Sequence, residues 1–200
     1  SLPLISITKS LAGAVVPVAD EDGVYDATYE ITVTNAGSGA GVYDLEDTLA
    51  VGEGVTVVGV QEVVTDAEDA DLNADFDGLD DVWIVTGQPI AGAEGEPVVH
   101  TYTVTVRYAV DLSDIALAEG DTCTDGGAPL AGTLSNVAAV DWNGIVDEDD
   151  ECLRPGKPTL DKELISAVPI GEGQWEVVYQ LTVGNLGHEA RSFTGSQAGV

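Results

Sequence analysis

Cationic side chains are scarce in this sequence: six Lys and Arg residues stand against 36 Asp and Glu residues in a chain of 200. The formal net charge is −30 at pH 7. Such a surface repels nucleic-acid phosphates and anionic lipid headgroups, so we expect no nucleic-acid partner. An acidic surface also keeps a protein soluble, and this is the simpler interpretation of most of the acids.

The sequence also lacks segments that would anchor it in a membrane or a cell wall. It has no run of 18 or more apolar residues, which predicts no membrane insertion in this segment. It has no secretory signal peptide and no sorting tail, so we expect the chain to be processed or excised from a longer one. Asn-x-Ser/Thr sequons are absent, which excludes N-glycosylation of that type.

Cysteine and histidine are rare as well, with two residues of each. Cys123 and Cys152 are either two buried thiols of a reducing compartment or a disulfide of an oxidising one. The acidic, β-rich sequence favours the disulfide, which would stabilise the fold by roughly 3–4 kcal/mol. His100 and His188 stand alone, so the sequence offers neither a good zinc site nor a catalytic Ser-His-Asp or Cys-His set. We therefore expect no enzyme.

Most of the chain follows the two-residue period of β-strands, with Gly, Pro, Asn and Asp between the apolar segments. Asn143-Gly144 after Trp142 is a strong hairpin signal. Short strands at this spacing predict an all-β, immunoglobulin-like antiparallel sandwich, and a short helical turn is expected at 112–118. The predicted strands are 4–11, 24–34, 42–49, 55–64, 82–86, 98–110 and 133–142.

One segment of the sequence occurs twice. The run YDATYEITVTNAG at 25–37 matches WEVVYQLTVGNLG at 175–187, an offset of about 150 residues. A repeat of this length predicts whole domains in tandem rather than a solenoid. We expect a complete immunoglobulin-like repeat at 1–153, a linker at 154–158, and at 159–200 the N-terminal part of a second, incomplete repeat.

The pieces TYEITVTNAGSG, VYDLEDTLAVGEGVTVV, NADFDG, HTYTVTVRY and LSNVAAV resemble the large repeat family of bacterial and archaeal surface proteins known as domain of unknown function eleven. The resemblance covers most of 1–153 and the start of the second copy. An acidic insert at 66–71 and Gly184 depart from the family's pattern. The resemblance implies an immunoglobulin-like sandwich in an extracellular or cell-surface adhesin, fibre or sheath, without catalytic activity. The partners it implies are neighbouring repeats or subunits of the same protein.

A second hypothesis is an adhesin module that binds a surface glycan or a host protein. Three tryptophans could provide a sugar platform for it, but buried core positions are their usual role in such sandwiches. No exposed aromatic cluster can be named from the sequence, which favours a structural stalk module. The three residues are Trp83, Trp142 and Trp175.

Three polar residues fall on apolar faces of predicted strands. With a period of two, Lys9, Asp47 and Asn136 should each point into the core. Because a lone buried charge is very costly, the three side chains should meet there. Their companions on the same faces are Ile5, Ile7 and Leu11, then Tyr43, Leu45 and Leu49, and finally Leu134, Ala138 and Val140.

This trio predicts an autocatalytic isopeptide crosslink. An apolar pocket lowers the pKa of Lys9, and it raises the pKa of Asp47, whose proton then polarises the side-chain carbonyl of Asn136. Attack by the neutral amine would expel ammonia and tie the first strand to the last. The arrangement resembles the self-crosslinking domains of Gram-positive pilins and adhesins. The alternative is a non-covalent Lys9–Asp47 pair hydrogen-bonded to Asn136.

An acidic loop suggests a Ca²⁺ site. Asn73, Asp75 and Asp77, followed by Gly78, imitate the first half of a calcium loop, but Ile84 stands where a bidentate Glu would complete it. The alternative is a loop element without metal, and no other cofactor is predicted. A calcium site of another shape would add Asp71, Asp80 and Asp81 as ligands.

Overall fold

The computed structural model describes residues 1–113, 115, 123–125, 127–154, 156, 158–185 and 187. The chain divides into two compact units, Ser1–Leu153 and Arg154–Val200, and the division falls where the predicted linker begins. The described residues form strands and turns without a helix, and hence contain no helix long and apolar enough to cross a membrane. Of the helical turn predicted at 112–118, only residues 112, 113 and 115 lie within the described part.

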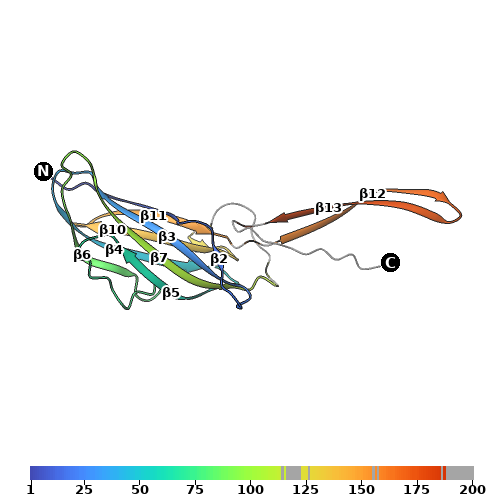
Figure 1. Cartoon of the computed structure of the whole chain (residues 1–200), viewed down its shortest axis with the longest axis horizontal. Coiled ribbons are helices and arrows are strands. Elements are labelled where there is room, and N and C mark those ends of the chain that lie inside the picture. Colours follow the sequence, from blue (N-terminus) through green and yellow to red (C-terminus); the bar gives the residue numbers. More distant parts are fainter. Residues whose placement is uncertain are drawn as a thin grey trace. The chain divides into compact units, whose positions relative to one another are not determined.

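The first unit is a sandwich of two antiparallel sheets, which confirms the predicted all-β fold class (Figure 1). One sheet has the order β1-β3-β7-β5, with the short β2 paired to β3, and the other has the order β11-β10-β4-β6. The strands of the first sheet are β1 (Ile5–Leu11), β2 (Val16–Pro17), β3 (Val24–Asn35), β5 (Val55–Thr65) and β7 (Val98–Val110). Those of the second sheet are β4 (Gly41–Val51), β6 (Trp83–Ile90), β10 (Leu134–Trp142) and β11 (Ile145–Leu153). A separate pair consists of β8 (Thr124–Asp125) and β9 (Ala128–Pro129).

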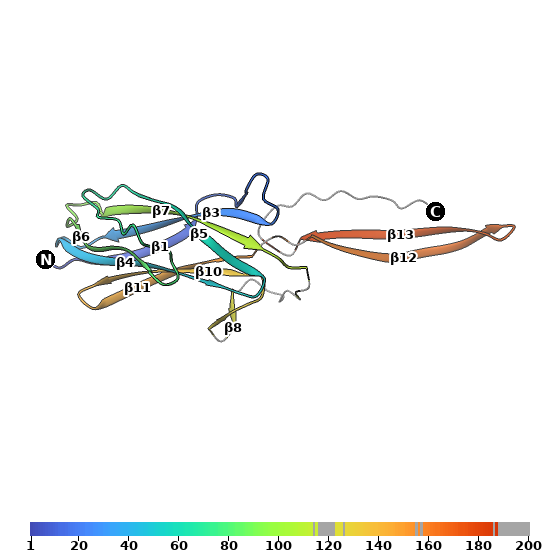
Figure 2. The same cartoon turned by 90° about the horizontal axis from the view of Figure 1, so that it is seen from below.

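The strand order is that of an immunoglobulin-like sandwich. If β1, β3, β4, β5, β7, β10 and β11 are lettered A to G, the two sheets read ABED and CFG, which is the constant-type arrangement. The strand β6 is an addition that pairs with the free side of β4. Figure 2 shows the two layers from a second direction.

The core lies between the sheets and follows the alternation of the sequence. On β3 and β7 every second side chain is buried, and the two strands place these side chains opposite one another. Burial of this continuous apolar layer is the main stabilising contribution to such a fold. Its largest fully buried side chains include Tyr29, Ile31, Tyr43, Leu45, Tyr102 and Tyr108.

The strand β11 was not predicted as a strand. Only the hairpin turn at Asn143-Gly144 that precedes it was expected, because the run at 147–151 is acidic rather than apolar. Its acids alternate instead: Asp147 and Asp149 turn toward β1, where their carboxylates accept the backbone N–H groups of Ile7 (3.0 Å) and Lys9 (2.7 Å). The two carboxylates therefore bind the backbone of β1 where a neighbouring strand would otherwise pair.

The described part of the second unit forms a hairpin of β12 (Pro158–Gly171) and β13 (Gln174–Asn185). Lys162 pairs with Leu181 in this hairpin, as Lys9 pairs with Ile31 between β1 and β3. Likewise Leu164 pairs with Tyr179, as Leu11 pairs with Tyr29. The two copies of the repeated sequence thus use the same strand register.

Candidate functional site

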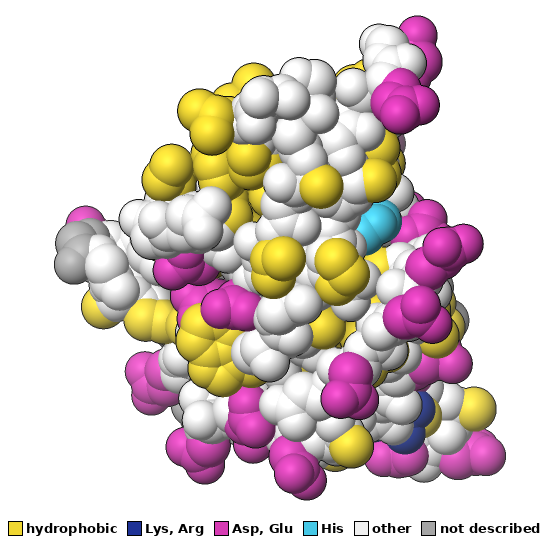
Figure 3. Space-filling view, turned by 90° about the vertical axis from the view of Figure 1, so that its left-hand side faces the viewer, with side chains coloured by type: hydrophobic (Ala, Val, Ile, Leu, Met, Phe, Trp, Pro, Cys, Tyr) yellow, Lys and Arg dark blue, Asp and Glu magenta, His cyan; other side chains and the backbone are white. Residues whose placement is uncertain are grey.

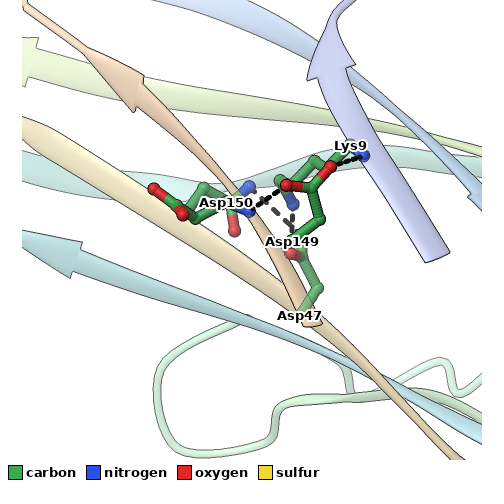
Figure 4. Close-up of polar contacts among 5 residues, drawn as sticks. Lys9, Asp47, Asp149 and Asp150 are labelled. Carbon is green, nitrogen blue, oxygen red and sulfur yellow. Dashed lines mark hydrogen bonds and ion pairs between the residues drawn. The ribbon is translucent and has the colours of Figure 1, made fainter. Parts of the chain in front are cut away.

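The first unit brings together the three polar residues that the strand periodicity placed in the core. Lys9 alternates with Ile5 and Ile7 on β1, and its side chain has no exposed surface. Asp47, on β4 in the facing sheet, is also fully buried. The Nζ atom of Lys9 forms an ion pair with Oδ1 of Asp47 (Figure 4).

Asn136 reaches the same carboxylate from β10. It pairs with Leu49 on β4, two residues from Asp47, so the two side chains lie diagonally on the inner face of one sheet. The Nδ2 atom of Asn136 donates a hydrogen bond of 3.2 Å to Oδ2 of Asp47. Asp47 therefore contacts Lys9 with one oxygen and Asn136 with the other.

The surroundings of this trio are mostly apolar and leave polar atoms unsatisfied. Lys9 Nζ lies 5.0 Å from the centre of the Tyr29 ring, a cation–π distance. Among the described residues, Tyr29 Oη and Asn136 Oδ1 are buried without a hydrogen-bond partner. An unsatisfied buried acceptor typically costs about 1–3 kcal/mol, so the Asn136 carbonyl is a costly feature for a purely structural contact.

Burial shifts the Lys9–Asp47 pair toward its neutral forms. Removal from water lowers the pKa of Lys9, although the nearby Asp47 charge acts in the opposite direction. Removal from water likewise raises the pKa of Asp47, although Lys9 and Asn136 oppose that shift. A neutral amine and a protonated carboxyl group are the forms that amide condensation requires, whereas an ion pair requires both charges.

The structure corrects one part of the crosslink prediction. Asn136 lies on β10, and β11 follows it, so a bond from Lys9 would join the first strand to the penultimate strand of the unit. The sequence interpretation also missed Asp149 and Glu151 on β11. Their negative charges oppose the lowering of the pKa of Lys9 by burial.

The predicted disulfide between Cys123 and Cys152 is present. The two Cα atoms are 5.4 Å apart, within the usual range for a disulfide. Cys152 lies on β11, so the bond attaches the segment before β8 to the sheet that carries Asn136.

The acidic loop is held by its own hydrogen bonds. The Oδ1 atom of Asp77 accepts the backbone N–H groups of Leu79, Asp80 and Asp81 at 2.8 to 3.0 Å. The hydrogen bond from Leu79, and to a smaller extent those from Asp81 and Asp80, lower the pKa of the Asp77 carboxyl group. Asn73 Oδ1 accepts the N–H of Asp75 at 3.1 Å.

The calcium site remains a prediction that these contacts do not test. Two of the expected ligand oxygens, Oδ1 of Asn73 and Oδ1 of Asp77, accept backbone N–H groups. Within the described residues, no group of three or more Asp, Glu, His or Cys side chains is arranged to hold a metal ion. The six predicted ligands were Asp71, Asn73, Asp75, Asp77, Asp80 and Asp81.

The expectation that the tryptophans are buried was wrong for two of the three. Trp175 is exposed on β13, and Trp83, at the start of β6, is 39% exposed, whereas Trp142 is partly buried against the core. An open hollow of about 490 Å³ lies beside Trp83. Asp71, Asn73, Asp81 and Thr86 are among the residues that line it.

No known family model matches this chain, and no curated protein matches it. The surface-protein repeat family therefore remains a prediction from the motifs. One solved structure with a distant likeness is that of the full-length major pilin SpaD from Corynebacterium diphtheriae. It has 12% sequence identity and a TM-score of 0.33 over 86% of this chain, which spans 39% of the pilin chain. At this distance the likeness identifies neither a family nor a function.

Proposed function

We propose that the chain is a non-catalytic structural module of a secreted or cell-surface protein, and that its first unit is tied internally by an isopeptide bond between Lys9 and Asn136. The observation that carries the proposal is the fully buried trio, in which Asp47 contacts both Lys9 and Asn136. Burying a lysine in an apolar core lowers the stability of the fold. A lysine at this position therefore suggests a function that offsets the cost.

In the proposed reaction, the neutral Nζ of Lys9 attacks Cγ of Asn136. A new C–N bond forms, the bond from Cγ to Nδ2 breaks, and Nδ2 leaves as ammonia with a proton that came from the amine. Protonated Asp47 donates a hydrogen bond to the carbonyl oxygen of Asn136 and relays that proton. The reaction needs no external oxidant, reductant or cofactor, because one amide replaces another.

The orientation of the Asn136 amide distinguishes the reactive state from the ion pair. With Nδ2 toward Asp47, the amide donates to a charged carboxylate, as the ion pair requires. A half-turn about the last side-chain bond would direct Oδ1 to a protonated Asp47 instead. That half-turn would also satisfy the carbonyl oxygen, which now lacks a partner among the described residues.

Other features support a place outside the cell. The Cys123–Cys152 disulfide is typical of oxidising compartments. The surface in Figure 3 carries acidic side chains around its apolar groups and shows cationic atoms in one small area. Together with the surface-protein motifs, these features support neighbouring repeats or subunits of the same protein as partners, in an adhesin, fibre or sheath.

The test is the mass of the intact protein. We expect it to be lower than the sequence mass by one ammonia after correction for the disulfide, and a protease digest should contain the peptides of Lys9 and Asn136 joined. Lys9→Ala should restore the full mass. A wild-type protein of full mass, with both peptides free, would exclude the bond and leave the ion pair.

One observation favours the second candidate function, binding of a glycan. The exposed indole of Trp83 beside a hollow with carboxylate and hydroxyl groups is the kind of surface on which a sugar ring stacks. A glycan array with the wild-type chain tests it, with Trp83→Ala and Trp175→Ala as a matched pair. Binding that is lost only in Trp83→Ala would establish this function.

A further inference from the structure

The hairpin of the second unit has an apolar face, and no other described strand of that unit covers it. Leu181 is 61% exposed and Tyr179 is 50% exposed, whereas their register equivalents Ile31 and Tyr29 are fully buried. An isolated two-stranded hairpin is only marginally stable in water, because it needs a further layer to bury its apolar side chains. The other exposed apolar residues of this face include Leu160, Trp175, Val177 and Val183.

The hairpin also repeats the position of the buried lysine. The Nζ atom of Lys162 lies 4.0 Å from the centre of the Tyr179 ring, as that of Lys9 lies 5.0 Å from the Tyr29 ring. In the first unit, Lys9 of the equivalent Lys9–Tyr29 pair contacts Asp47 on the opposite sheet. The hairpin therefore carries an apolar face with one cation at its centre.

We propose that this face of β12 and β13 is a docking surface for a β-sheet that presents an apolar face with one inward carboxylate to Lys162. Two observations define this partner. The shared register shows how β1 and β3 bury the same positions, and charge complementarity requires an acid opposite Lys162, because an unpaired lysine in such an interface is costly. The proposal extends the structural role proposed above, but it does not depend on a crosslink in the first unit.

The sheet of the first unit that carries Asp47 serves as a test partner for the hairpin, whose segments are grafted into the positions of β1 and β3. In the full chain, Thr159–Leu164 replaces Ser6–Leu11, and Gln174–Asn185 replaces Val24–Asn35. The replaced and replacing segments have equal lengths, so every loop is kept. The control graft replaces Val24–Asn35 by the segment one residue earlier, 173–184. This shift would turn Glu176, Gln180 and Thr182 into the core.

We expect the in-register graft to melt cooperatively, at a temperature somewhat below that of the wild type, because Val177 is larger than the Ala27 that it replaces. The grafts are made in an Asn136→Ala background, which cannot form the crosslink. There the lysine at position 9 should resist an amine-acetylating reagent, whereas Lys162 of the wild-type hairpin should react. The shifted graft should show no cooperative transition. Adding Asp47→Ala to the in-register graft should lower its melting temperature further, because the grafted lysine loses its acid.

A second in-register graft keeps Tyr25 and Ala27 instead of the larger Trp175 and Val177. If this graft also fails to fold, overpacking of the core is not the reason. The proposal is overturned if both in-register grafts fail to fold, if the shifted graft folds equally well, or if Asp47→Ala leaves the grafted protein unaffected. These readouts are folding and acetylation. They are therefore separate from the ammonia loss of the wild type, on which the proposed crosslink depends.

Discussion

Lys9 and Asp47 come from opposite sheets of the sandwich and form an ion pair with no exposed surface on either side chain. This pair is the point from which the chemistry of the first unit can be tested. Burial raises the pKa of Asp47 and lowers that of Lys9, whereas the attraction between the two groups acts in the opposite direction on each pKa.

The first prediction concerns the role of Asp47 in the crosslink. Asp47→Ala should give a folded protein of full mass, because Asp47 promotes the condensation but is not part of the product. Asn136→Ala should also have full mass, since it removes the electrophile. Intact-protein mass spectrometry measures both. If Asp47→Ala still loses ammonia, Asp47 does not promote the reaction.

The second prediction concerns the stability of the buried pair without a crosslink. In an Asn136→Ala background, which cannot form the bond, Lys9→Met or Asp47→Leu alone should lower the free energy of unfolding by about 3–5 kcal/mol. Each substitution leaves one buried group without its partner. The double variant should lose much less, because no charge remains to be buried. Denaturant unfolding of the four proteins gives this cycle, and additive losses would show that the two residues do not interact.

The third prediction concerns the disulfide, which joins residues separated by 29 positions. Titration of the unfolded, unreduced protein should find no free thiol. Cys123→Ser together with Cys152→Ser should lower the free energy of unfolding by roughly 3–4 kcal/mol in the chain-entropy model. The control is the wild type in reducing buffer, which should behave like the double variant. Two titratable thiols in the untreated protein would contradict the bond.

The fourth prediction separates calcium binding from hydrogen bonding in the acidic loop. Asp77→Ala should lower the melting temperature because three backbone N–H groups lose their acceptor. Asp75→Ala should change it little, since Asp75 contributes its backbone N–H to this loop. Chelation should leave the wild-type melting curve unchanged. A melting temperature that falls on chelation, and no longer does so in the Asp75→Ala plus Asp77→Ala variant, would establish the calcium site instead.

The fifth prediction concerns the pH dependence of the Asp26–Arg107 pair, which joins β3 to β7 through two hydrogen bonds of 2.8 Å. The bond from Arg107 lowers the pKa of Asp26 below its ordinary value of 3.8. The pair therefore stabilises the fold above that value, and its contribution disappears as the pH falls through the lower pKa of the folded state. Asp26→Asn should cost about 0.2–1 kcal/mol at neutral pH, because both side chains are partly exposed. The difference from wild type should vanish once the pH has fallen below the folded-state pKa of Asp26, and a difference that persists in acid would point to packing rather than charge.

The inward direction of Lys9, Asp47 and Asn136 could be predicted from the sequence. On β1 and β4 buried and more exposed residues alternate, so a two-residue period places Lys9 and Asp47 on the inner face. On β10 both faces are largely buried, and Asn136 shares its face with Leu134, Ala138 and Val140. The shared pairing of β1 with β3 and of β12 with β13 was likewise implied by the matching sequences, because register follows the apolar pattern.

Other features could not be predicted because they depend on contacts between distant segments. β11 has no apolar alternation at 147–151, since the side chains that turn inward there are acids that bind the backbone of β1. Trp83 was expected in the core because sandwiches usually bury tryptophan. However, Trp83 begins β6, which pairs at the free side of β4, and its side chain is partly in solvent. The hydrogen bonds that Asp77 accepts could not be foreseen either, because their donors are backbone groups, which residue types do not reveal.

The carboxylates of Asp147 and Asp149 on the backbone of β1 have a consequence for aggregation. A strand from another molecule that approached β1 would find the N–H groups of Ile7 and Lys9 already hydrogen-bonded. Its own carbonyl groups would also lie close to two negatively charged carboxylates. Proteins that are packed densely side by side on a surface risk fusing through such strands. This arrangement gives the molecule a local safeguard against amyloid-like growth that overall acidity alone would not provide.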